Sequence, residues 1–188
     1  MTDEGAVAPD VEPASQEAEP EAPQDSAPPR PHRFFRLTLP IVAVVVLLDQ
    51  LTKDWAISTL ADGRTPHVIW TLQWNLSFNS GMAFSKGQGI GPIIGLLAVV
   101  VVVVIGLSVR HSNSRMLDVA AGLVMGGALG NLVDRLFRGE GWLHGSVIDF
   151  IDFQWFPIFN LADVGVNVGG GLFVLWSLLS REAEGVAK

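Results

Sequence analysis

The sequence contains no cysteine and only four histidines. Without cysteine the chain cannot form a disulfide, use a thiolate nucleophile or bind a metal through sulfur. The histidines are far apart, at residues 32, 67, 111 and 144, and no two share a spacing typical of metal ligands. We therefore expect neither a bound metal nor another cofactor.

Charge is scarce in the sequence after its N-terminal segment. Residues 1–31 hold eight of the 19 acidic residues and seven of the 11 prolines, with a single arginine. Such a composition buries too little apolar surface to offset the entropy of ordering, so we predict a disordered acidic tail over residues 1–31. The remaining chain has eleven acidic and eleven basic residues, and this neutral balance gives no support for nucleic-acid binding.

Long apolar segments dominate the rest of the chain. Residues 90–109 carry no charge over 20 positions, about the length that crosses a hydrocarbon core ~30 Å thick. Lipid leaves backbone groups no outside partner, which favours helices over isolated strands. Three further segments are apolar with few charges: 37–57, 116–136 and 164–180. The sequence therefore predicts an all-α polytopic membrane protein with four transmembrane helices over residues 32–182, and a short cytoplasmic tail at 183–188.

Two patterns predict how this bundle is oriented and what lies outside it. With four spans, one side of the membrane collects Arg30, Arg33, Arg36, Arg110, Arg115 and Arg181. The positive-inside rule then predicts that both termini are cytoplasmic. Residues 71–78 alternate apolar and polar side chains, which predicts a strand with one buried face and hence a small extracytoplasmic β-sheet.

The ionisable and amide residues near the spans gather at one depth in this topology, close to the outer face. A charge within a span costs about 2.5–3.5 kcal/mol on insertion scales, so this group is a candidate functional site. Its members are Asp49, Lys53, Asn131, Asp134, Arg135, Asp149, Asp152 and Asp163.

Structural roles compete with a catalytic one for several of these residues. Asp49 and Lys53 have the spacing of a stabilising helix ion pair. Asp163 could do no more than cap the N-terminus of the last span, where a negative charge interacts favourably with the helix dipole. Two carboxylates within hydrogen-bond reach, by contrast, share a proton, and the pair can activate water and polarise a carbonyl. Asp149 and Asp163 could form such a pair, although spacing alone leaves the role of Asp152 open.

Five short motifs carry a family resemblance: DQLTK (49–53), NSGMAF (79–84), GGALGNLVDR (126–135), VIDF (147–150) and FNLAD (159–163). Together they resemble, in order, the lipoprotein signal peptidase (signal peptidase II) family over residues 37–180. The resemblance implies an aspartic endopeptidase with Asp149 and Asp163 as its catalytic pair and Asp152 as a bystander. It also implies supporting or substrate-binding positions at Asp49, Lys53, Asn79, Gly81, Asn131, Asp134, Arg135, Asn160 and Ala162.

The resemblance further implies a substrate and a location. The substrates are prolipoproteins that carry a diacylglyceryl cysteine, cut just before that cysteine, with membrane lipid as the surrounding partner. The enzyme lies in the bacterial cytoplasmic (inner) membrane with its active site near the outer face. One departure is Val164, which stands where many members of the family have a hydroxyl residue.

Two other classes of function stay open from the residues alone. A small transporter or proton relay would use the same acids, and it predicts a polar path that continues to the cytoplasmic side. Asp118 is the only acid in the inner halves of the predicted spans, which speaks against such a path. A scaffold protein, recruited through the acidic tail, predicts that replacing either Asp149 or Asp163 by asparagine leaves function intact.

Overall fold

Four α-helices and a small antiparallel sheet make up the described part of the chain, which is residues 34–81, 90–110 and 112–186 of a computed structural model. The predicted tail over residues 1–31 lies outside this part. A π-helical turn (η1, Phe34–Thr38) leads into α1 (Leu39–Leu60). The other elements are β1 (His67–Ile69), β2 (Leu72–Asn79), α2 (Gly91–Val109), α3 (Arg115–Phe137), β3 (Val147–Asp152) and α4 (Leu161–Val186).

Within the described residues, three helices are long and apolar enough to cross a membrane: α2, α3 and residues Leu161–Ser180 of α4. The mean hydropathy of α2 reaches 2.9, as expected for its uncharged valine-rich sequence. Helix α1 forms where the first span is predicted, but three charged residues interrupt its apolar sequence. Length and composition therefore support three spans, and the fourth stays a prediction.

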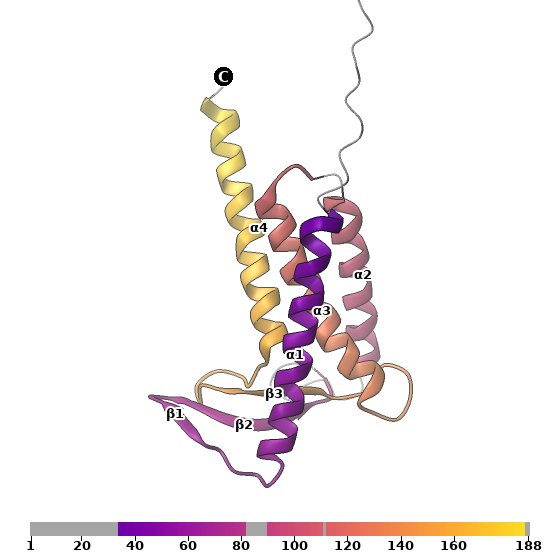
Figure 1. Cartoon of the computed structure of the whole chain (residues 1–188), viewed down its shortest axis with the longest axis vertical. Coiled ribbons are helices and arrows are strands. Elements are labelled where there is room, and N and C mark those ends of the chain that lie inside the picture. The colour runs from indigo at the N-terminus through magenta and orange to yellow at the C-terminus, as the bar shows by residue number, and fades with distance from the viewer. Residues whose placement is uncertain (1–33, 82–89, 111, 187–188) are drawn as a thin grey trace, which may run out of the picture. The chain divides into compact units, whose positions relative to one another are not determined.

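Helix α3 is the centre of the bundle and packs against α1, α2 and α4 (Figure 1). A Cβ atom on Gly127 would overlap the backbone of α4, so the close approach of α3 and α4 depends on a small residue. Gly122 and Gly126 of α3 face α1 instead. A Cβ atom on either would lie 2.7 Å from Ile41 or Val45, respectively. These two glycines therefore let α1 lie close to α3.

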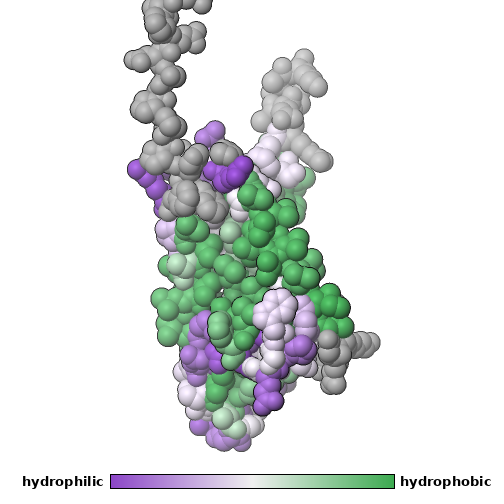
Figure 2. All heavy atoms as spheres, turned by 90° about the vertical axis from the view of Figure 1, so that its right-hand side faces the viewer, coloured by the Kyte–Doolittle hydropathy of each residue, from purple (hydrophilic) through white to green (hydrophobic). Residues whose placement is uncertain are grey.

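The surface of the bundle agrees with a membrane environment. Figure 2 shows a broad hydrophobic zone over the helices, with hydrophilic residues gathered towards the two ends. On α2 the side chains of Ile93, Leu97 and Leu107 are each more than half exposed. A helix this apolar and this exposed is expected to contact lipid, and the chain is accordingly a membrane protein.

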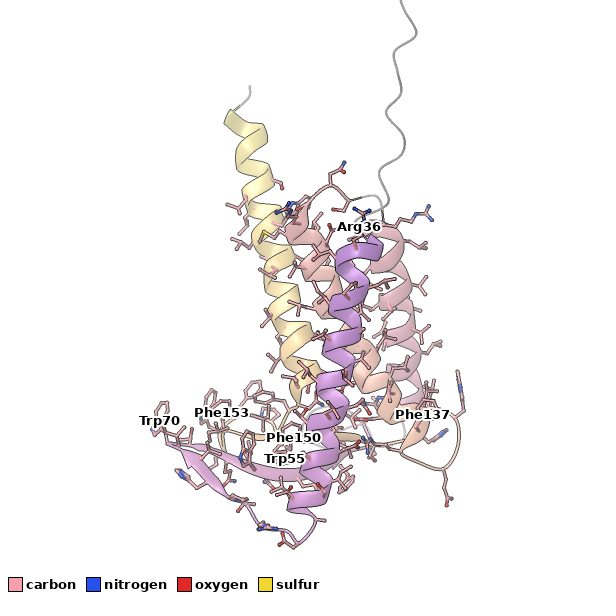
Figure 3. The ribbon with its side chains drawn as sticks, in the orientation of Figure 1. Arg36, Trp55, Trp70, Phe137, Phe150 and Phe153 are labelled. Atoms are coloured by element: carbon pink, nitrogen blue, oxygen red, sulfur yellow. The ribbon has the colours of Figure 1, made fainter. Side chains whose placement is uncertain are left out.

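The sheet lies at one end of the bundle in the order β1-β2-β3 (Figure 1). Strand β2 confirms the strand predicted from the alternation over residues 71–78. Its apolar side chains Trp74 and Leu76 pack with Phe150 of β3 against the C-terminal part of α1. Trp55 of α1 lies edge-on to Phe150, with ring centroids 6.0 Å apart (Figure 3). This contact anchors the sheet to the bundle.

A bulge in β2 lies between its pairing positions with Asp149 and Asp152 of β3. Ser77 pairs with Asp149 and Gln73 with Asp152, so that β2 has one residue more than β3 between these pairs. The extra residue changes the face to which the following β2 side chains point relative to β3, because side chains alternate along a strand. With it, both carboxylates meet amide side chains of β2.

Candidate active site

Asp149 and Asp163 line the same cavity, which has a volume of about 510 Å³. Asp149 projects from β3, and Asp163 lies in the first turn of α4. The remaining lining is largely apolar and comprises Asn79, Phe156, Pro157, Ile158, Phe159, Val164, Asn167 and Val168. The two residues predicted as a pair therefore face one space, although 13 residues lie between them in the sequence.

Asp149 is almost completely buried, with 3% of its surface exposed. One carboxylate oxygen accepts a hydrogen bond from Asn160 Nδ2 at 2.6 Å, and the other accepts one from Asn79 Nδ2 at 3.1 Å. Burial, and then the nearby charge of Asp163, raise the pKa of Asp149 to about 6. The two amide hydrogen bonds and the charge of Lys53 lower this pKa, but they offset only part of the rise. Asp149 therefore retains its proton at a pH where an ordinary aspartate is ionised.

Asp163 is oriented by the start of its own helix. Its carboxylate accepts a hydrogen bond from the backbone N–H of Asn160 at 3.2 Å, and its own N–H donates to Asn160 Oδ1 at 3.0 Å. This reciprocal pair is a capping box, the sequence signal of which is the N-x-x-D spacing of Asn160 and Asp163. The other carboxylate oxygen accepts from Asn131 Nδ2 at 2.9 Å. Both oxygens of Asp163 thus receive donors, at a helix end that favours negative charge.

Two asparagines connect the two acids. Asn160 uses both hydrogens of its amide nitrogen, one toward Asp149 and one toward Asn131 Oδ1 at 3.1 Å. Asn131 Oδ1 also accepts from Lys53 Nζ at 2.9 Å. Since an ammonium group only donates, this contact fixes which end of the Asn131 amide points to Lys53, and so turns its nitrogen toward Asp163.

A buried ion cluster supports the site from α1 and α3. Lys53 Nζ lies 2.8 Å from a carboxylate oxygen of Asp49 and 2.8 Å from one of Asp134, and all three side chains are fully buried. Asp49 also accepts the backbone N–H of Ala162 at 2.9 Å, and Asp134 accepts that of Ile148 at 3.1 Å. Ala162 and Ile148 immediately precede Asp163 and Asp149. Each acid of the cluster therefore holds the backbone beside one member of the pair.

Close packing makes room for this cluster. A Cβ atom on Gly130 would lie 2.6 Å from a carboxylate oxygen of Asp49 and 3.3 Å from the side chain of Ala162. Only glycine at this position of α3 lets the Asp49 carboxylate pass between the helices to reach the start of α4. Gly130 belongs to the motif GGALGNLVDR, so this motif supplies a small residue that the packing of the site requires.

Arg135 and Gly81 organise the end of β2. Arg135 Nη2 donates to the carbonyl oxygen of Gly81 at 3.1 Å, and the N–H of Gly81 donates to Asn79 Oδ1 at 3.1 Å. Asn79 is thereby turned so that its nitrogen faces Asp149. Arg135 is 5% exposed, and within the described ranges its Nη1 has no hydrogen-bond partner.

Two residues join the site that the sequence interpretation missed. Gln50 Nε2 donates to the carbonyl oxygen of Gly130 at 3.1 Å and to Asp134 at 3.2 Å, and Arg138 Nε donates to Asp134 at 2.8 Å. Gln50 stands beside Asp49 in an otherwise apolar span, and Arg138 follows Asp134 at the i,i+4 spacing of a helix ion pair. Both signals were present in the sequence.

Asp152 lies apart from the shared cavity of Asp149 and Asp163. Its carboxylate accepts hydrogen bonds from Gln73 Nε2 at 2.7 Å, from Asn75 Nδ2 at 2.9 Å and from the backbone N–H of Gln154 at 2.6 Å. Burial raises the pKa of Asp152, but these three hydrogen bonds outweigh burial and lower it below the ordinary value. Asp152 is accordingly an ionised carboxylate whose partners belong to the sheet and the following loop.

Comparison with known proteins gives one consistent family. The family described as signal peptidase (SPase) II matches residues 41–179. The lipoprotein signal peptidase of Mycobacterium avium (strain 104) is 41% identical over 172 residues, which cover 90% of this chain and 94% of the relative. The lipoprotein signal peptidase of Mycobacterium leprae (strain Br4923) is 40% identical over 159 residues, covering 84% of this chain and 79% of the relative.

Two solved structures share the fold. Both are titled as a bacterial membrane enzyme structure by the in meso method, at 2.3 Å and 1.9 Å resolution. The first superposes with a TM-score of 0.68 at 28% sequence identity, covering 81% of this chain and 93% of the other. The second has a TM-score of 0.66 at 28% identity, covering 78% of this chain and 96% of the other.

Proposed function

The chain belongs to the signal peptidase II family, and from this premise we propose that it is an aspartic endopeptidase that removes the signal peptide from prolipoproteins. Its substrate is a prolipoprotein whose cysteine carries a diacylglyceryl group, and the bond cleaved is the one just before that cysteine. The observation that carries the proposal is that Asp149 and Asp163 line one cavity and are joined through Asn160.

In this mechanism the two aspartates share one proton. Asp149, whose pKa burial and the charge of Asp163 raise to about 6, is the protonated member and donates to the carbonyl oxygen of the scissile bond. Asp163 is the ionised member, supported by two donors and by the helix dipole. It acts as general base and takes a proton from the attacking water. The different surroundings of the two acids thus separate their roles.

The supporting residues hold the two carboxyl groups in their different surroundings. The amides of Asn79 and Asn160 hold the Asp149 carboxyl, and Asn131 holds the Asp163 carboxylate in an orientation set by Lys53. A preorganised polar frame of this kind needs little rearrangement when charge develops in the transition state. Its contribution is therefore to keep the carboxyl oxygens in place during the reaction.

We also infer that α1 is the fourth membrane span. Its two cluster residues, Asp49 and Lys53, are fully buried against α3. Other side chains of α1 are more than half exposed, namely Val44, Leu47 and Leu51. Two of the three charges that break its apolar sequence therefore face protein, where ionisable residues in membranes are normally found, and the third, Asp54, is exposed and pairs with Arg138. Four spans and the arginine distribution together support cytoplasmic termini and a sheet near the outer face.

The cavity suits a substrate that arrives from the membrane. Phe156, Ile158, Val164 and Val168 give it apolar walls beside the two acids. We infer that the signal peptide enters laterally from the bilayer and that the acyl chains of the modified cysteine remain in lipid. A proton relay is less well supported, because α3 has no ionisable residue between Asp118 and Asp134.

The test is cleavage of a diacylglyceryl-modified prolipoprotein by the purified full chain in detergent. Asp149→Asn and Asp163→Asn should each abolish cleavage while keeping the thermal unfolding profile of the unmodified protein. A chain that fails to cut this substrate, under conditions in which a related lipoprotein signal peptidase cuts it, would rule the proposal out. Full activity in either asparagine variant would rule out the two-aspartate mechanism and leave the activity standing.

A further inference from the structure

The segment 153–159 joins the strand that carries Asp149 to the helix that carries Asp163. It also forms a wall of the cavity between them, because Phe156, Pro157, Ile158 and Phe159 are among the lining residues. Its position therefore decides the width of the space in which a substrate would lie.

The base of this loop is closed by backbone hydrogen bonds. The N–H groups of Phe150 and Ile151 donate to the carbonyl oxygen of Phe159 at 3.0 and 2.8 Å. The N–H of Phe159 in turn donates to the carbonyl oxygen of Ile151 at 3.1 Å. These contacts fix the two ends of the loop beside β3. They do not reach residues 153–158, which include three of its four lining residues.

Asp152 supplies the contact that extends into the loop. One carboxylate oxygen accepts from the N–H of Gln154 at 2.6 Å, and the other accepts from Gln73 and Asn75 of β2 at 2.7 and 2.9 Å. Gln154 has a φ angle of 68°, a left-handed conformation that is uncommon for a residue other than glycine. Gln154 Nε2 adds a second tie, to the carbonyl oxygen of Thr71 at 3.0 Å.

Aromatic packing alone leaves the loop weakly held. Phe153 stacks on Phe159 with ring centroids 5.9 Å apart, and Phe156 contacts Phe159 edge-on at 5.9 Å. Trp155 is nevertheless 72% exposed and Phe156 is 53% exposed. Rings that are so little covered by protein gain little from burial. The polar contacts of Asp152 and Gln154 with the sheet therefore restrain the loop where its exposed rings do not.

We propose that Asp152 is a positioning residue that controls substrate affinity by holding the loop 153–159 as a wall of the cleavage cavity. This inference rests on the proposed function. The wall consists of aromatic and aliphatic side chains, so the part of the substrate that it contacts is apolar chain next to the scissile bond. Asp152 is not one of the residues that line the cavity, and it does not touch the reacting atoms.

Steady-state cleavage of a diacylglyceryl prolipoprotein peptide by the full chain in detergent tests this role. Asp152→Ala should raise KM about tenfold and leave kcat within about threefold, because it weakens binding without altering the acids that react. Asp152→Asn should stay close to the unmodified protein, since the amides of Gln73 and Asn75 can turn their oxygens toward the new NH₂ group. Asp62→Ala, at an exposed acid outside the site, is the matched control and should change neither constant.

Hydrogen–deuterium exchange gives a second readout that does not depend on activity. In Asp152→Ala, exchange should become faster over residues 153–159 and stay unchanged in α3. Gln73→Ala removes one donor to Asp152 and should raise KM by about twofold to threefold. It therefore tests the positioning role of Asp152 if Asp152→Ala fails to fold.

Several outcomes would overturn the inference. An unchanged KM and unchanged exchange in Asp152→Ala would make Asp152 a bystander. Loss of kcat in Asp152→Asn would make its carboxylate part of the chemistry. Failure of the proposed function is distinguishable from both, because then the unmodified chain itself would not cleave the peptide.

Discussion

Replacing Lys53 by methionine is the sharpest test of the buried ion cluster. The Lys53 ammonium is fully buried and lies 2.8 Å from both Asp49 and Asp134. Methionine has a similar volume but no charge, so the variant leaves two buried carboxylates without their shared cation. Breaking a buried ion pair costs about 3–5 kcal/mol, and we expect the free energy of unfolding to fall by about 4 kcal/mol. That is a large part of the ~5–15 kcal/mol that typically stabilises a folded protein.

The assay is denaturant unfolding in a mild detergent, followed by tryptophan fluorescence. Arg64→Met is the matched control, because Arg64 pairs with Asp62 at 3.1 Å while both side chains are 58% exposed. A pair so exposed to solvent contributes at most about 1 kcal/mol. Adding Asp49→Asn to Lys53→Met should recover about 1–2 kcal/mol, because Asp49 is the carboxylate left without a cation, whereas Asp134 keeps its ion pair with Arg138.

A specific result would refute this reasoning. If Lys53→Met lost no more stability than Arg64→Met, the ammonium would not be compensating the two acids. If the added Asp49→Asn made the protein still less stable, the contacts of Asp49 other than the ion pair would be the dominant ones. Cleavage should also fall in Lys53→Met, because Asn131 loses the contact that orients its amide toward Asp163.

Three other predictions follow from the site and the packing. Asp149→Asn and Asp163→Asn should each lower kcat by at least about 100-fold, measured by single-turnover cleavage, because the pair needs one acid and one base. Since burial and the charge of Asp163 raise the pKa of Asp149 to about 6, the shared proton is kept below this pH and lost above it. A pH profile of kcat/KM should therefore fall about tenfold per pH unit above the upper apparent pKa of the pair, and a profile that rises there would contradict the assignment. Gly127→Ala should lower thermal stability, because a Cβ atom would overlap the carbonyl of Ala162, whereas Gly170→Ala has no atom within 4 Å and should raise it slightly.

Local patterns predicted the elements of the fold well. The uncharged run at 90–109 became α2 (Gly91–Val109), and the alternating residues 71–78 became β2 (Leu72–Asn79). Both signals depend on neighbours a few residues apart and on the contrast between apolar and polar side chains, which the sequence states directly. The spacing of Asn160 and Asp163 likewise contains the capping box that orients one of the two acids.

The partners of the buried acids depended on tertiary structure. Asp49 meets the N–H of Ala162, which is 113 residues away, and Asp134 meets that of Ile148. No local pattern predicts these pairs, because they require α1, α3, α4 and β3 to be packed first. The same holds for Gly122 and Gly126, whose regular spacing shows that a helix can approach closely but not which helix does so.

The sequence by itself determined that this protein is a bundle of apolar helices with a small sheet, and its motifs determined the family. Tertiary structure alone decided that Asp149 and Asp152, three residues apart on one strand, have different surroundings. Asp149 meets Asn160 and the cavity shared with Asp163, whereas the partners of Asp152 belong to β2 and the following loop. The physical reason is that the environment of a carboxylate depends on which distant groups pack against it, and only the assembled fold brings those groups together.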